Sequence, residues 1–204
     1  MPILVRFCDP SMTSAAIVAE LLDVVFPDAK DGVDMTHGRG GFWNGHSRLD
    51  IVKHDLEPQY APHGAMDFRD MRYGDKSFDV ALFDPPQIAD AGARGIMGNR
   101  FGTYNRGELE TAIRMGAAEA WRISHLGIIV KVCDHVHGQR YVLESDWVRS
   151  ALEWRAPYEV VFQIRKKPLT DPKWKEPQLS ARSNGATYLA FRHGDQRHIA
   201  RKPA

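Results

Sequence analysis

Short apolar runs alternate with helical patterns along most of this chain, and this alternation restricts the folds that it can adopt. Apolar side chains recur at helical spacing over residues 11–26, 105–124 and 144–155. Strand-like runs cover residues 32–35, 48–55, 77–84, 126–134, 158–165 and 186–192. Strands and helices in alternation build βαβ units with right-handed crossovers. The sequence therefore predicts an α/β fold with a Rossmann-like, doubly wound, mostly parallel sheet.

The last two strand candidates, 158–165 and 186–192, are joined by a polar stretch in place of a helix. A connection without a helix favours antiparallel pairing, so we expect an antiparallel edge hairpin. With 204 residues and 43% hydrophobic content, the chain suffices for one substantial core. We therefore expect a single domain over residues 1–204.

The composition gives no sign of secretion or of membrane insertion. Cys8 and Cys133 are the only cysteines, and no basic flank precedes an apolar stretch and a cleavage site. No apolar run approaches the roughly 20 residues that a membrane-spanning helix needs. We expect a cytoplasmic protein with no membrane partner.

Charge is distributed unevenly along the chain. Residues 1–148 carry 15 Lys and Arg against 21 Asp and Glu, whereas residues 149–204 carry 12 against 5. A basic tail of this kind can form a local face for a polyanion such as a nucleic acid. A solvated surface that serves only solubility is the alternative.

In a parallel sheet, ligands bind beyond the carboxyl ends of the strands, near the point where strand order reverses. Four segments belong to this rim: 34–42, 55, 67–69 and 84–87. The first is rich in glycine, which lets the backbone approach a ligand without Cβ atoms in the way. No Gly-Lys-Ser/Thr follows it and the GxGxxG spacing is incomplete, which disfavours a phosphate loop and a dinucleotide site. A turn that uses glycine for shape alone is the structural alternative.

Acids recur at the successive strand ends of this rim. Asp55 ends the second strand, where a carboxylate can accept hydrogen bonds from a ribose diol. Asp67 can accept a bond from an adenine amino group while Phe68 covers the ring. A helix cap or a solvated charge is the ordinary role of any one acid, and their recurrence is what favours a ligand site.

The stretch DPPQ, residues 84–87, ends the third strand with an acid and two prolines. Prolines fix the backbone direction and have no N–H donor, so Asp84 and the Pro85 carbonyl become rigidly held acceptors. Such a set suits an amino group, whose lone pair it would aim at an electrophile across the rim. A strand that ends in a stiff turn is the structural alternative.

Three stretches, VDMTHGRGGF, MDFRDMRYGDKSFDVALFDPPQ and GIIVKVCD, resemble in order and spacing the class I S-adenosylmethionine-dependent methyltransferases that methylate amino groups of DNA bases. The resemblance covers residues 11–193, and the Asp-Pro-Pro element is its most specific part. It implies S-adenosyl-L-methionine as the cofactor, bound by Asp34, Thr36, Gly38, Gly40, Phe42, Asp55, Asp67 and Phe68. It implies catalysis by Asp84, Pro85, Pro86 and Gln87.

One departure from the family concerns the fourth catalytic position. That position usually carries an aromatic residue that stacks on a flipped-out base, and Gln87 stands there in this chain. The loop 88–107 could supply the missing contacts from Arg100, Phe101 and Tyr104, and its five glycines suit a mobile lid.

A second candidate for substrate recognition is the insertion 166–185. It carries Lys173, Trp174 and Lys175, a mix suited to phosphate contacts beside an aromatic platform. A lysine-rich loop that serves only solubility is the alternative.

Cys133, His135 and His137 follow the fourth strand at alternate positions, as metal ligands on one face of a strand do. No paired spacing of the zinc-finger kind accompanies them. We therefore expect rim or substrate-loop residues here, with no metal site.

These features and the resemblance together favour an enzyme that methylates an exocyclic amino group of a nucleic-acid base, with adenine in DNA as the first choice, and it is the resemblance that implies DNA. Such a compact enzyme would suit a phage or mobile element. A ribose 2′-hydroxyl RNA methyltransferase is the first alternative, because Lys131 beside Asp84 could lower the pKa of a hydroxyl. A catalytically inactive module that binds cofactor or nucleic acid is the second, and Gln87 supports it.

Overall fold

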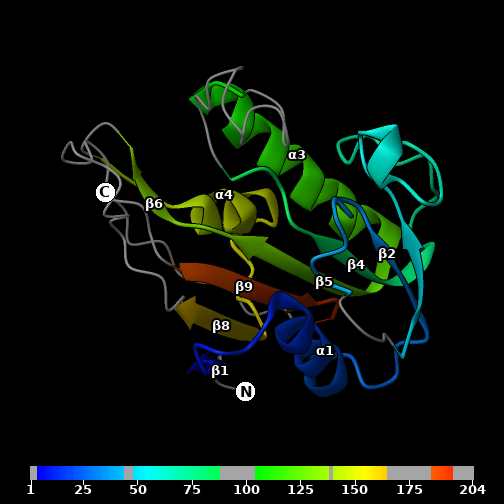
Figure 1. Ribbon diagram of the computed structural model, residues 1–204, viewed down its shortest axis with the longest axis horizontal. Helices are drawn as coiled ribbons and strands as arrows, with labels where there is room; N and C mark the ends of the chain where they lie inside the picture. Colours follow the sequence, from blue (N-terminus) through cyan, green and yellow to red (C-terminus); the bar gives the residue numbers. More distant parts are fainter. Residues whose placement is uncertain (1–3, 44–47, 88–103, 138–139, 165–184, 195–204) are drawn as a thin grey trace.

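The computed structural model describes residues 4–43, 48–87, 104–137, 140–164 and 185–194. Within these residues, seven strands form one sheet in the order β1-β8-β9-β5-β4-β2-β3 (Figure 1). They are β1 (Leu4–Phe7), β2 (Asp31–Asp34), β3 (Asp50–Lys53), β4 (Phe78–Phe83), β5 (Ser124–Val132), β8 (Glu159–Ile164) and β9 (Gly185–Arg192). A separate small hairpin pairs β6 (His135–His137) with β7 (Arg140–Val142). The helices are α1 (Ser14–Val25), α3 (Arg106–Ile123), α4 (Glu144–Ala151) and the 3-10 turn η1 (Pro58–Tyr60).

The predicted Rossmann-like, mostly parallel sheet is confirmed. β9 is antiparallel to both of its neighbours, β5 and β8, and the other strand pairs of the sheet are parallel. The antiparallel pair β8–β9 is also as predicted. It lies one strand inside the edge, because β1 pairs in parallel with β8. β1 was not predicted, since its four residues are too few to show a period.

The helix boundaries follow capping chemistry in the sequence. Thr13 caps α1 by accepting a hydrogen bond from the Ala16 N–H at 3.1 Å. Asn105 and Glu108 form a reciprocal capping box at the start of α3. In the described part of the chain, no helix is both long enough and apolar enough to cross a membrane.

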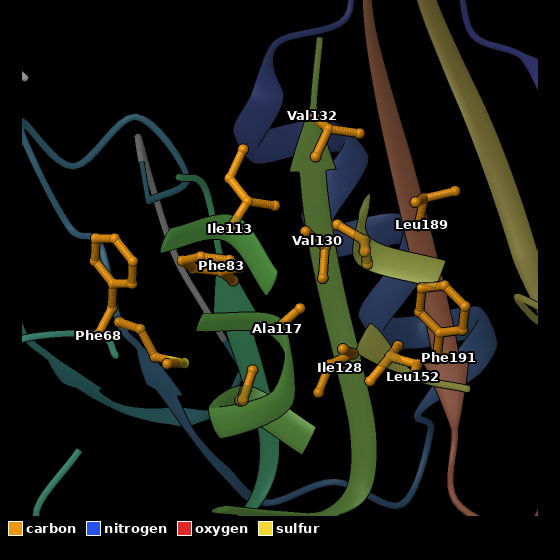
Figure 2. Packing of buried hydrophobic residues seen from close by; sticks show 14 of the residues in the cluster. Phe68, Phe83, Ile113, Ala117, Ile128, Val130, Val132, Leu152, Leu189 and Phe191 are labelled. Carbon is orange, nitrogen blue, oxygen red and sulfur yellow. The ribbon is translucent and has the colours of Figure 1, made fainter. Parts of the chain in front are cut away.

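The helices lie on both faces of the sheet, with α3 and α4 on one face and α1 on the other (Figure 1). Each face has its own buried cluster. Leu109, Ile113 and Ala117 are completely buried on α3, as their spacing predicts. Figure 2 shows the larger cluster, in which Phe68 and Phe83 lie beside α3. Because this packing holds α3 against β4, it also fixes the carboxyl end of β4.

The segment between β3 and β4 departs most from regular α/β geometry. It contains η1 and a single bridge between Asp55 and Ala65, with no helix and no further sheet strand among its described residues. The buried His54 ties this segment down, since its ring nitrogens bond the Gly64 carbonyl and the Tyr73 hydroxyl, each at 2.7 Å. Hydrogen bonds of a side chain therefore hold this segment in place, as backbone hydrogen bonds hold the strands of the sheet.

Candidate functional site

A cavity of about 300 Å³ lies beyond the carboxyl ends of β2, β3 and β4. The rule that ligands bind at this edge of a parallel sheet predicts such a cavity. Thirteen described residues line it: Thr36, His37, Gly38, Arg39, Gly41, Asp55, Leu56, Glu57, Tyr60, Phe68, Asp84, Pro86 and Tyr104. Residues from all the predicted rim segments therefore come to one place.

The glycine turn after β2 needs glycine for its backbone. Gly38 and Gly40 have φ angles of 53° and 75°, in the left-handed region that other residues rarely adopt. The Gly38 N–H donates to Asp55 Oδ2 at 2.8 Å, and the His37 N–H donates to the His54 carbonyl at 2.8 Å. The turn is thus bonded to the end of β3, where Asp55 also lines the cavity.

Asp34 braces this turn from inside the protein. It is 1% exposed, and its carboxylate accepts bonds from the Thr36 N–H at 3.1 Å and the Trp43 indole N–H at 2.5 Å. His37 Nδ1 lies 3.3 Å from the same carboxylate. Asp34 is absent from the described lining of the cavity, so its contribution there is to the shape of the turn. His37 and Trp43 were not predicted, and their positions within the glycine-rich stretch were the only signal for them.

Gly40 and Phe42 also lie away from the lining of this cavity. Phe42 borders a second cavity of about 310 Å³ between α1 and the glycine turn. The charged groups of that second cavity are Asp23 and Arg48, which pair with each other at 2.8 Å. Because those charges satisfy one another, we place the chemistry in the first cavity.

The first cavity is partly aromatic. Phe68, Tyr60 and Tyr104 line it, and burial raises the pKa of the Tyr104 hydroxyl. Asp67 and Arg69 pair at 2.6 Å, and the hydrogen bonds from Arg69 lower the pKa of the Asp67 carboxyl. The structure places Tyr104, predicted as a substrate contact, beside the predicted cofactor residues.

Asp84 is held by contacts from the glycine turn, from Gln87 and from β5. Its N–H donates to Thr36 Oγ1 at 2.8 Å, which links the end of β4 to the glycine turn. Asp84 Oδ1 accepts a bond from Gln87 Nε2 at 2.6 Å, and Oδ2 accepts one from Lys131 Nζ at 2.7 Å. Lys131 comes from β5, and its side chain is 9% exposed against 27% for Asp84. The main prediction had no role for Lys131, which entered only through the hydroxyl alternative.

The remaining substrate contacts fall on other parts of the chain. Five of the six predicted ones lie outside the described residues: Arg100, Phe101, Lys173, Trp174 and Lys175.

Near the end of β5, His135 Nδ1 lies 3.4 Å from Glu144 Oε1, and Cys133 donates its thiol to the Gly185 carbonyl at 3.2 Å. No group of three His, Cys, Asp or Glu side chains in the described ranges is arranged to hold a metal ion.

No protein-family model matches this chain, and no curated protein does. Its fold is similar to that of the N-methyltransferase NodS from Bradyrhizobium japonicum WM9, solved with S-adenosylhomocysteine, with a TM-score of 0.54 and 12% identity over 89% of each chain. BH2331 from Bacillus halodurans C-125 has a TM-score of 0.51 and 13% identity, over 86% of this chain and 97% of that one.

DesVI from Streptomyces venezuelae is 16% identical, with a TM-score of 0.39. The match covers 61% of this chain and spans 57% of the length of DesVI. The structural likeness to NodS and BH2331 shows a shared fold, and the activity of this protein is argued from its site.

Proposed function

We propose that this protein is an S-adenosylmethionine-dependent methyltransferase that acts on an exocyclic amino group of a nucleic-acid base, adenine in DNA first. One observation carries the proposal: the glycine turn, the acid Asp55, the aromatic Phe68 and the acceptor Asp84 border one cavity. Its volume of about 300 Å³ is at the lower end of the usual range for small-molecule sites, about 300–1,000 Å³. The fold shared with NodS, which was solved with S-adenosylhomocysteine, supports the choice of cofactor.

The residues of the cavity fit this cofactor. The backbone at Gly38 leaves room for close approach, since a Cβ there would meet no side chain within 4 Å. Asp55 already accepts two backbone N–H bonds, but a carboxylate has about four acceptor positions, so ribose hydroxyls fit it as well. Phe68 and Tyr104 offer apolar faces for an adenine ring. When bound, the cofactor would supply an electrophilic methyl group on its sulfonium.

The acceptor amino group would bind at Asp84. The carboxylate and the Pro85 carbonyl would accept its two N–H bonds and aim the nitrogen lone pair toward the cofactor end of the cavity. On accepting the methyl group the nitrogen would gain a positive charge, the cofactor would leave as a neutral thioether, and Asp84, which would hold the amino group, could receive the proton that the nitrogen then loses. Holding the reacting atoms in this geometry supplies most of the rate enhancement.

The test is transfer of a radiolabelled methyl group from S-adenosylmethionine to unmethylated DNA, with RNA in parallel, followed by nucleoside digestion and mass spectrometry. Methyladenine or methylcytosine from DNA is the expected product. Binding of S-adenosylhomocysteine without transfer to either nucleic acid would contradict the proposal and favour a non-catalytic module.

One specific contact favours a second candidate, methylation of a ribose 2′-hydroxyl in RNA. Lys131 Nζ lies 2.7 Å from Asp84 Oδ2. An ammonium group therefore lies beside the carboxylate at which the atom to be methylated would bind. An ammonium in that place can stabilise an alkoxide as a hydroxyl loses its proton. Against this candidate stand the two prolines, which present rigid acceptors suited to an amino group.

Replacement of Lys131 by Ala separates the two candidates. Loss of an acid–base group costs about 10²–10⁴-fold in rate, so hydroxyl methylation should fall at least about 100-fold. Amino methylation should stay within about tenfold of the wild type, because positioning by Asp84 and Pro85 persists. A rate of base methylation that fell as far as the hydroxyl reaction is expected to fall would contradict the amino-group proposal.

A further inference from the structure

Gln87 binds the carboxylate that the proposed reaction needs for its acceptor. Its amide nitrogen donates to Asp84 Oδ1 at 2.6 Å, while Lys131 holds the other oxygen at 2.7 Å. Gln87 and Asp84 are both partly exposed, and Pro86, between them in sequence, lines the cavity together with Asp84. An amino group of this chain thus already lies on Asp84.

The chemistry of that amino group resembles the proposed substrate. A carboxamide presents a planar –NH₂ beside a carbonyl acceptor. Adenine presents a planar N6 amino group beside the ring nitrogen N1, and cytosine presents its N4 amino group beside N3. In each case a donor and an acceptor are bonded to the same carbon atom and lie on one planar edge. The Gln87 side chain therefore has the hydrogen-bonding pattern of the base edge that would be methylated.

We infer that Gln87 occupies the acceptor's place on Asp84 and must leave it before a substrate amino group can bind. This inference rests on the proposed amino-group function and assigns Gln87 as a positioning residue that keeps Asp84 in place until the acceptor arrives. Lys131 stays during the exchange, because its side chain is 9% exposed and projects from the central strand β5. Gln87 is freer to leave, since it lies beyond β4 and is less buried.

The exchange predicts the direction in which the affinity for the acceptor changes when Gln87 is replaced. An acceptor that displaces Gln87 gains one bond to Asp84 while the protein loses another, so removing the Gln87 amide should tighten acceptor binding. A residue that stacks on the acceptor, as the aromatic residue at this position does in the family, would have the opposite effect. Its removal would weaken binding.

The experiment measures the KM for unmethylated mixed-sequence DNA with the wild type, Gln87→Ala and Gln87→Asn. Asn keeps the amide on a side chain one methylene shorter, so it controls for polarity while withdrawing the amide from Asp84. A hydrogen bond to a charged group corresponds to about a tenfold change in affinity, so the KM should fall by about tenfold in both variants. The dissociation constant of S-adenosylhomocysteine, measured by calorimetry, should stay within about twofold, because Gln87 is not among the described residues that line the cofactor cavity.

The outcomes separate this inference from the proposed function. Label on an amino group, with a lower KM in both variants, supports both. Label on an amino group, with a KM that is unchanged or raised in either variant, overturns the role of Gln87 and leaves the amino-group function standing. Label from the wild type on ribose, or on neither nucleic acid, overturns the proposed function and this inference with it.

Discussion

Asp84 is held both through its backbone N–H and through its carboxylate. Thr36 accepts the bond from its N–H, Gln87 and Lys131 hold its two carboxylate oxygens, and Pro85 follows it directly. Together these contacts hold Asp84 at the end of β4, and the loss of one leaves the others in place. Because catalysis by positioning depends on direction, the chemistry of the site should respond to changes at Asp84 much more than cofactor binding does.

Replacing Asp84 by Ala should therefore lower methyl transfer by at least about 100-fold. The dissociation constant of S-adenosylhomocysteine should change by less than about threefold, since the glycine turn, Asp55 and Phe68 remain. Filter-binding assays of label transfer and calorimetry give the two values. Equal loss of transfer and of cofactor affinity would show that Asp84 serves the cofactor instead.

Asp84→Ala also leaves Lys131 as a buried ammonium without this partner, and such a loss destabilises proteins. The double variant Asp84→Ala, Lys131→Met removes that charge while retaining apolar volume, and it controls for misfolding. It should unfold at a higher temperature than the single variant and remain inactive. Recovered transfer in the double variant would trace the loss to the unpaired lysine.

At the scale of elements, the predictions from sequence succeeded for elements in which apolar side chains recur over many residues or a capping motif marks the end. α3 spans 18 residues with a capping box at its start, and it falls within one residue of its predicted range. β1 escaped notice because its four residues pair with β8, about 155 positions away in sequence. The hairpin β6–β7 escaped notice because its strands, of three residues each, are too short to show a period.

The site was predictable as a place and less so in its contacts. Carboxyl ends of parallel strands meet at one edge, so the rim segments could be brought together from sequence. The directions of the side chains could not be predicted from sequence. Asp34, the last residue of β2, bonds Thr36 and Trp43, and Phe42 borders the second cavity, although the lining residue Gly38 lies between them in sequence.

The contact between α3 and β4 gives a prediction about stability. A Cβ at Gly116 would lie 2.3 Å from Phe83 Cζ and 2.8 Å from Phe68 Cδ2, and both rings are buried. Gly116→Ala should therefore destabilise the protein by about 1–3 kcal/mol, although Ala is favoured over Gly within a helix by about 1 kcal/mol. Urea denaturation followed by circular dichroism measures the free energy of unfolding.

Gly107→Ala is the matched control in the same helix. A Cβ there would meet only Asn105 Oδ1, at an ordinary 3.6 Å. This change should leave stability unchanged or raise it by up to about 1 kcal/mol. Equal losses in the two variants would show that close packing at Gly116 is not what makes glycine necessary there.

At the scale of the whole molecule, two histidines at opposite ends of the sheet have opposite pKa shifts. The hydrogen bond to Glu144 raises the pKa of His135, which follows the carboxyl end of β5. Burial lowers the pKa of the His193 ring, and the backbone N–H of His193 donates to the Leu126 carbonyl near the start of β5. Folding thus favours the charged form of one ring and the neutral form of the other.

The two shifts predict opposite pH dependences of stability. A raised folded pKa adds stability that is fully present below the unfolded value of about 6.5 and is lost as pH rises above it. The difference in unfolding free energy between the wild type and His135→Gln should therefore shrink from pH 6.5 to pH 8.

A lowered folded pKa adds stability that is present above about 6.5 and is lost as pH falls. The corresponding difference for His193→Gln should shrink from pH 6.5 to pH 5. Urea titrations at the three pH values measure both, and parallel changes in the two variants would mean that some other titrating group dominates, because these two rings are shifted in opposite senses.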